Sequence, residues 1–319
     1  VEVFNLATLI PFLTLLSEPE RISEIDLFYK FAQFLNITDR NGLLYLFTSL
    51  FVIVIIFSSF LRIFTIWLCT RYSALIGSDL SCQYYKKVLS RPYIVHLQRN
   101  SSELLASATT YVEGTQIFLF AFLQVITSIV IATSLLFSLI YINWFIASLS
   151  FLFFGIIYLL IAKLVKKRLD FNGKIIVQFS DLQLKKIQEG IGSIKEVLIH
   201  NLQNTFFRIY KKADLPLRLK KGEGLFISGF PKYLIEAIGL VLISLFALIL
   251  SLNGDNKFSL LAILGALALA AQRLLPALQN IYNGWANMIA YTSSVKTILK
   301  EIETNQSREE SEKTLNSNF

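Results

Sequence analysis

The longest apolar stretch of the chain, residues 117–162, constrains the fold more than any other feature. It joins IFLFAFLQVITSIVIATSLLFSLI (117–140) directly to YINWFIASLSFLFFGIIYLLIA (141–162). A helix rises about 1.5 Å per residue and about 20 apolar residues cross a bilayer, so this stretch is far too long for one crossing. It therefore predicts a hairpin of two membrane spans, in which Tyr141, Asn143 and Trp144 form a polar turn with interfacial aromatic residues.

Other apolar runs extend the prediction to six spans, the first of which is truncated at its start. They are residues 1–16, 43–69, 233–252 and 258 to about 282. Only 16% of the residues are charged and the mean hydropathy is +0.58, whereas about a quarter of the residues of a soluble domain are charged. The sequence therefore predicts an all-α, polytopic membrane protein.

The distribution of basic residues predicts the orientation. Residues 163–232 carry fifteen Lys/Arg and six Asp/Glu, and Arg71–Ser102 carries five and one, whereas Ser17–Asn41 carries three and five. Basic loops face the cytoplasm, so we expect the first two segments and the C-terminus on that side. The formal net charge of +8 fits basic residues beside spans, and we expect the bilayer and no nucleic acid as a partner.

The first inner connection predicts a short helix between two long ones. Pro92 ends the incoming helix, because it has no N–H to donate and clashes with the preceding turn. Asn100 with Glu103 three residues later resembles a capping box that starts the next helix. The segment Tyr93–Arg99 is thus predicted to form a two-turn helix that exposes apolar side chains.

The second inner connection repeats this arrangement. Apolar residues at three- and four-residue steps over 173–199 predict that the fourth span continues as a helix into the cytoplasm. Residues 200–214 follow, with an aromatic cluster on one short helix. Two exposed aromatic patches at the tips of two helical fingers are typical of a protein-docking surface. Alternatively, the two patches pack on each other.

These segments together resemble the membrane domain of type IV ABC exporters over nearly the whole chain. The resemblance lies in LSRPYIVHLQRNSSELLASATTYVE, IQEGIGSIKEVLIHNLQNTFFRIY and AQRLLPALQNIYNGWANMIAYTSSVKTILKEIE. VEVFNLATLIPFL, PKYLIEAIGL and QRLLPALQ are similar to the subgroup of lipid-linked oligosaccharide flippases. The resemblance implies an all-α fold of six transmembrane helices, long cytoplasmic helical extensions and two short coupling helices, in residues 1–303 of this chain. Residues 304–319 would be a polar connector.

The resemblance further implies a homodimer whose cavity is switched by a nucleotide-binding ATPase domain, which supplies ATP and Mg²⁺. The chain lacks G-x-x-x-x-G-K-[ST] and LSGGQ, so no catalytic residue is expected in it, and we expect the ATPase to be fused beyond residue 319 or to be a separate chain. The expected substrate is a lipid, a lipid-linked oligosaccharide or a polysaccharide precursor, moved across a bacterial inner membrane. The two coupling helices would be Tyr93–Arg99 and about Leu202–Ile209. The residues that would couple to the ATPase are Tyr93, Ile94, Val95, His96, Leu97, Gln98, Arg99, Leu202, Asn204, Phe206, Phe207 and Ile209.

Four ionisable residues fall within the predicted spans, where charges are costly. They are Glu2, Arg62, Glu236 and Arg273. At about 1.5 Å per residue they lie roughly 21–28 Å from the outer ends of their helices, in one layer of the inner half of the bilayer. In one interpretation they neutralise each other and hold the bundle together. In the other, the arginines grip a phosphate head group, for which a guanidinium fork is suited.

The remaining polar residues form no recognisable catalytic or metal site. Cys69 and Cys82 have no metal-ligand spacing and are expected to be reduced structural thiols. His96 and His200 fall at the two finger tips, where we expect them to serve as polar caps. A rival hypothesis is a six-span channel or receptor whose fingers dock a different partner, although no re-entrant loop or polar pore stripe supports a channel. A lipid-modifying membrane enzyme would need an interfacial carboxylate or histidine cluster, which the sequence does not offer.

Overall fold

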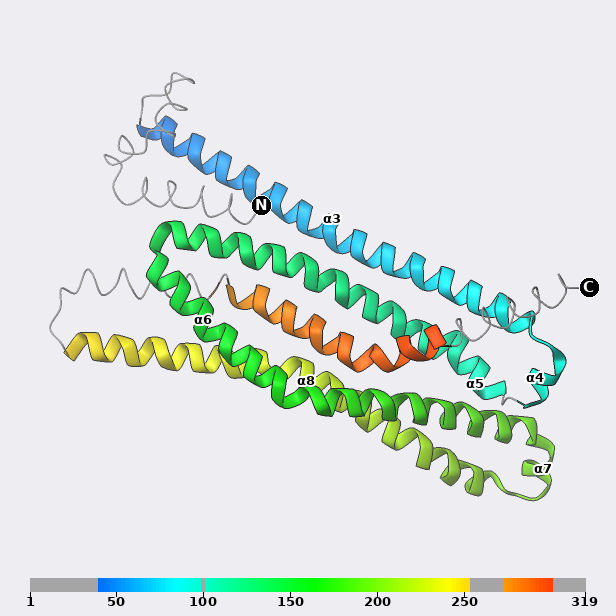
Figure 1. Ribbon diagram of the computed structural model, residues 1–319. Coiled ribbons are helices and arrows are strands. Elements are labelled where there is room, and N and C mark those ends of the chain that lie inside the picture. Colours follow the sequence, from blue (N-terminus) through cyan, green and yellow to red (C-terminus); the bar gives the residue numbers. More distant parts are fainter. Residues whose placement is uncertain (1–39, 99–100, 253–271, 273, 301–319) are drawn as a thin grey trace, which may run out of the picture.

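In the computed structural model, residues 40–98, 101–252, 272 and 274–300 are described, and they are helical apart from short turns. Figure 1 shows long helices that run side by side along the molecule. The elements in chain order are α3 (Arg40–Leu89), α4 (Tyr93–Gln98), α5 (Ser101–Ala106), the π-helical turn η2 (Ser107–Tyr111), α6 (Val112–Gly192), α7 (Ile194–Ile199) and α8 (Gln203–Leu252). A further helix occupies residues 274–300.

Some of the described helices have the length and hydropathy of membrane spans. Three stretches qualify, namely Thr48–Leu89, Leu104–Phe137 and Gln203–Val241. Their apolar side chains are largely exposed, as lipid-facing residues are: Ile53, Phe57 and Phe60 of α3 are examples. The chain is therefore a membrane protein whose described residues are helical apart from short turns. The predicted span 1–16, most of the span from 258, the loop 253–257 and the connector 304–319 lie outside the described residues.

Helix α6 doubles back on itself, as the hairpin prediction requires. Figure 1 shows its first half running away from η2, turning sharply and returning beside itself. Tyr111, just before α6, is hydrogen-bonded to Val177 and Asp181 of the returning half. Trp144 is the midpoint between Tyr111 and Val177 in the chain, so the reversal falls within the predicted turn. The backbone stays helical through residues 141–150, whereas the sequence predicts a polar break there.

The helix 274–300 lies between the two halves of α6 and forms the centre of the bundle (Figure 1). Its Gly284 packs against Val125 of the first half, while the Tyr282 ring contacts Tyr158 of the second half at a tilt of 38°, with ring centroids 5.6 Å apart. The Tyr282 hydroxyl also donates a hydrogen bond of 3.0 Å to the Ile227 carbonyl of α8. The main apolar core therefore gathers side chains from three helical segments: Phe154, Tyr158, Ile161, Leu169, Ile227, Ile235, Leu278, Tyr282 and Ala286.

Helix α8 packs antiparallel along the returning half of α6, and two contacts fix the register. Arg168 is ion-paired with Glu223, and the Lys220 ammonium lies 5.9 Å from the centre of the Phe171 ring. Each residue farther along α6 is thus level with a residue one position earlier in α8. Pro216 and Pro231 are both accommodated inside α8, which continues through them for 50 residues.

Candidate functional site

The first finger tip is the six-residue helix α4, where the sequence predicted a short helix. Helix α3 ends at Leu89, three residues before Pro92, and α4 begins directly after it. The side chains of Tyr93, Ile94 and Leu97 are 76%, 63% and 67% exposed. Such exposure of three neighbouring apolar side chains is unusual for a surface helix in water and is typical of a surface that another molecule covers.

At the first tip, the structure agrees with the sequence prediction for the residues that it describes. Val95 and Gln98 belong to α4, and His96 is half-buried on it. Arg99 and the predicted cap residue Asn100 lie outside the described residues, and α5 begins at Ser101. The predicted start of a new helix at this point is thus consistent with the structure.

The second finger tip is a tight turn between α7 and α8. Asn201 adopts a left-handed backbone with φ 54°. The Leu202 N–H donates to the Val197 carbonyl over 2.9 Å, and the Asn201 N–H donates to Leu198 over 3.4 Å. This is the Schellman arrangement, which ends a helix and satisfies its last carbonyls. Asparagine tolerates the left-handed conformation better than most residues, so the sequence favours the turn at this point.

The separate short helix expected at about Leu202–Ile209 was wrongly placed. The short helix at this tip is α7, and residues from Gln203 onward are the first turns of α8. The aromatic cluster in this segment does not interrupt the helix, because no residue there removes a backbone hydrogen bond.

Most of the side chains predicted at the second tip are exposed, and one is packed against the protein. Asn204 is exposed, and Leu202, Phe207 and Ile209 are 37%, 61% and 38% exposed. Phe206 instead is partly covered near Gly190 at the end of α6. Four of the five predicted residues therefore present surface at this tip.

Both tips lie at one end of the molecule. Figure 1 shows α4 and α7 at the same end of the long helices, opposite the end where α6 reverses. The helix 274–300 runs toward that same end and stops beside α5, where its Ile298 packs with Ala106. The two tips thus share one end of the molecule, which we call the tip face.

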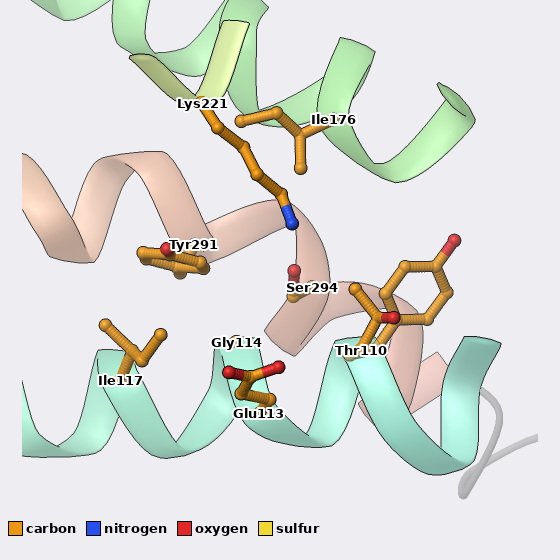
Figure 2. Close-up of a pocket in the computed structure, with 9 residues that line it drawn as sticks. Thr110, Glu113, Gly114, Ile117, Ile176, Lys221, Tyr291 and Ser294 are labelled. Atoms are coloured by element: carbon orange, nitrogen blue, oxygen red, sulfur yellow. The ribbon is translucent and has the colours of Figure 1, made fainter. Parts of the chain in front are cut away.

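A hollow that sequence reasoning missed lies between α6, α8 and the helix 274–300. Its cavity volume is about 60 Å³. Figure 2 shows Lys221 reaching from α8 along Ile176 toward Ser294, with Glu113 on the opposite wall. The hollow is lined by Thr110, Tyr111, Glu113, Gly114, Ile117, Ile176, Lys221, Tyr291 and Ser294.

Close packing and charge shape this hollow. A Cβ atom on Gly114 would lie 2.8 Å from the Ser294 Oγ, so the absence of a side chain lets the two helices approach. Burial raises the pKa of the Tyr291 phenol, and the nearby Glu113 carboxylate raises that pKa further. The hollow thus offers hydroxyl groups between one cation and one anion, a combination suited to water or a small polar ligand.

Buried polar groups continue on both sides of the hollow along α6. Asn172, Ile176 and Ser180 are spaced four residues apart and therefore share one helix face. Asn172 is 1% and Ser180 is 3% exposed. Within the described part of the chain, their side-chain polar atoms have no hydrogen-bond partner. Buried amides and hydroxyls are usually satisfied by water or a partner, so this face is built for polar contacts.

The predicted layer of charges is only half described. Arg62 on α3 and Glu236 on α8 are both exposed on their helices. Glu2 and Arg273 lie outside the described residues. Both interpretations of this layer, the ion-pair layer and the head-group site, therefore stay predictions.

The fold and these sites define a helical membrane protein with an exposed tip face. No known family model matches this chain.

Proposed function

We propose that this chain is the membrane half of an ATP-driven ABC exporter or flippase. The observation that carries the proposal is the tip face. Two apolar finger tips, α4 and the α7–α8 turn, lie at one end of the molecule, and the helix 274–300 runs toward that end. An ATPase that follows this helix, or binds beside it, would meet both tips at once.

The helices that carry the tips are suited to transmitting force. Helix α3 runs without a break for 50 residues from the predicted span to the first tip. The returning half of α6 and α8 connect the second tip to the bundle in the same way. In this proposal, closure of the ATPase domains displaces the tips, and the continuous helices carry that displacement to the membrane cavity.

The transported substrate in this proposal is amphipathic: a lipid, a lipid-linked oligosaccharide or a polysaccharide precursor. An arginine in the inner half of the bilayer would meet the phosphate of such a substrate. Replacing Arg273 by Gln should then abolish transport and leave folding intact. Normal transport by Arg273→Gln would rule out the head-group role of that residue.

The first test of the proposal is genetic. The coding sequence beyond residue 319, or a neighbouring gene, should contain a strand followed by G-x-x-x-x-G-K-[ST]. If no ATPase is encoded in either place, the tip face has a different partner, and the channel or receptor hypothesis gains support.

The second test measures coupling in the assembled transporter. Leu97→Asp places a charge on the apolar surface of α4 and should lower ATP hydrolysis in liposomes severalfold, because a desolvated apolar contact is lost. Leu219→Asp is the matched control, since Leu219 is 63% exposed on α8 away from the tip residues. Equal rates for the two variants would contradict a coupling role for α4.

A further inference from the structure

Four lysines gather where the returning half of α6 and α8 leave their predicted membrane spans. Lys163, Lys166 and Lys167 directly follow the uncharged run 141–162, and Lys232 directly precedes the apolar run 233–252. All four side chains are exposed. We call these four residues the boundary lysines.

The helix register brings the boundary lysines to one level. Arg168 is paired with Glu223 across the antiparallel helices. By that register, Lys163 is level with Ser228 of α8. Lys232 follows four residues later, which is about 6 Å farther along the helix axis. The lysines from two distant parts of the sequence therefore lie within about 12 Å of one another along the helix axes, at the predicted edge of the membrane, and we treat them together as one basic patch.

The patch carries positive charge that the described part of the chain does not neutralise. Neighbouring cations are paired: Lys174 with Asp170, and Lys220 with Glu223. None of the boundary lysines has a carboxylate partner within the described residues. Lys163 and Lys167 are also four residues apart on one helix face, where like charges repel. An external anion would remove this repulsion.

Exposed apolar side chains accompany the lysines. Leu164 is 80% and Tyr233 is 70% exposed. The Lys232 ammonium lies 5.8 Å from the centre of the Tyr233 ring, which holds that charge beside an aromatic side chain typical of the interface. A ligand with anionic groups above acyl chains matches both features, whereas a soluble anion matches only the charge.

We propose that the boundary lysines bind the headgroups of anionic phospholipids in the adjoining leaflet. Clusters of lysines beside a span attract such headgroups, and each lysine near the surface strengthens the attraction roughly fivefold. Leu164 and Tyr233 would lie against the upper acyl chains while the lysine stems extend to the phosphates. This inference does not depend on the proposed transport function.

The test compares lipids on the purified protein in mild detergent. Phosphatidylglycerol should raise the thermal unfolding midpoint more than an equal amount of phosphatidylcholine. The variant K163Q/K166Q/K167Q/K232Q should lose this difference. The matched control K185Q/K195Q/K211Q/K212Q removes four exposed charges elsewhere and should keep it. Equal shifts with both lipids, or an unchanged response of the first variant, would overturn the proposal.

Two further arms separate lipid binding from the binding of a soluble anion. Glycerol 3-phosphate carries the anionic group without acyl chains and should give little or no shift; a shift as large as that of phosphatidylglycerol would identify a soluble-anion site instead. Raising the ionic strength to about 1 M should weaken the phosphatidylglycerol effect on the unaltered protein, because the Debye length falls to about 3 Å. An effect that salt leaves unchanged would overturn the proposal even if the fourfold variant failed to fold.

Discussion

The Tyr111 hydroxyl donates a hydrogen bond to the Asp181 carboxylate over 2.5 Å and thereby joins the start of α6 to its returning half. The same oxygen lies 3.1 Å from the Val177 carbonyl. Tyr111 is the last residue of the π-helical turn η2 and is 2% exposed. Single π-turns within helices often occur at functional positions, and this one presents a side chain that ties two long helical segments together.

We expect Tyr111→Phe to lower the free energy of unfolding by about 1.5–3 kcal/mol, because it removes a hydrogen bond to a charged group. Thermal or denaturant unfolding in detergent measures this loss. Tyr85→Phe is the control, since Tyr85 is 59% exposed on α3. A loss no greater than that of Tyr85→Phe would show that the bond contributes nothing to stability.

Gly173 is expected to tolerate no side chain. A Cβ atom there would lie 2.5 Å from the Ala290 carbonyl oxygen, which belongs to the backbone of the central helix and cannot rotate away. Gly173→Ala should therefore cost about 1–3 kcal/mol of stability, as overpacking does. Gly222→Ala, at an exposed helical position with no atom within 4 Å, should instead stabilise the protein slightly. The melting temperatures of the two variants should thus move in opposite directions.

The turn at Asn201 gives a prediction about the second tip. Asn201→Val forces a β-branched residue into the left-handed conformation and should destabilise the tip by about 1–2 kcal/mol. Asn201→Gly should be neutral, because glycine adopts this conformation freely. Limited proteolysis at the α7–α8 turn distinguishes the two: only the valine variant should be cut faster. Equal cleavage of both variants would contradict the Schellman turn.

The raised pKa of Tyr291 predicts a loss of stability in alkali. The folded protein holds the phenolic proton more tightly than the unfolded chain, whose tyrosines titrate near pH 10. The contribution of Tyr291 to the free energy of unfolding is therefore fully present below about pH 10, and it falls as the pH rises toward the pKa of Tyr291 in the folded protein. Above about pH 10, the melting temperature of Tyr291→Phe should fall less than that of the unaltered protein. Parallel pH curves for the two proteins would refute this assignment.

Glu113→Gln tests the electrostatic part of the same shift. Burial of Tyr291 remains in this variant, but the nearby negative charge is removed. The pKa of Tyr291 should fall toward its ordinary value, and the alkaline loss of stability attributable to Tyr291 should become smaller. Subtracting the titration curve of the double variant Glu113→Gln/Tyr291→Phe from that of Glu113→Gln separates the titration of the Tyr291 phenol from that of the other tyrosines. An unchanged pKa of Tyr291 would show that burial alone causes the shift.

Periodicity and length predicted the large features of this fold. The run 117–162 was too long for one crossing, and the chain does reverse near Trp144. Pro92 likewise marks the first tip, because loss of a backbone donor is a local property that the sequence displays directly. The second short helix was misplaced because an aromatic cluster is not a helix boundary. The better signal for the end of the helix was at His200 and Asn201, directly after the apolar stripe, because asparagine tolerates a positive φ.

The hollow and its neighbours could not be predicted in the same way. Lys221, Glu113 and Ser294 come from three segments far apart in the chain, and only the packing of α6 around the central helix brings them together. The approach of Gly173 to Ala290 is equally a product of tertiary packing. No local pattern in the sequence distinguishes Gly173 from the exposed Gly222.

The central position of the helix 274–300 has a consequence for biosynthesis. The segment that completes the core is the last described part of the chain to leave the ribosome, after α3, α6 and α8. Until it arrives, Tyr158 and Ile227 lack the partners that Tyr282 supplies. The earlier helices therefore lack part of their core until this segment is made, and a nascent chain that stops before residue 274 should be recognised by quality-control proteases as unfinished.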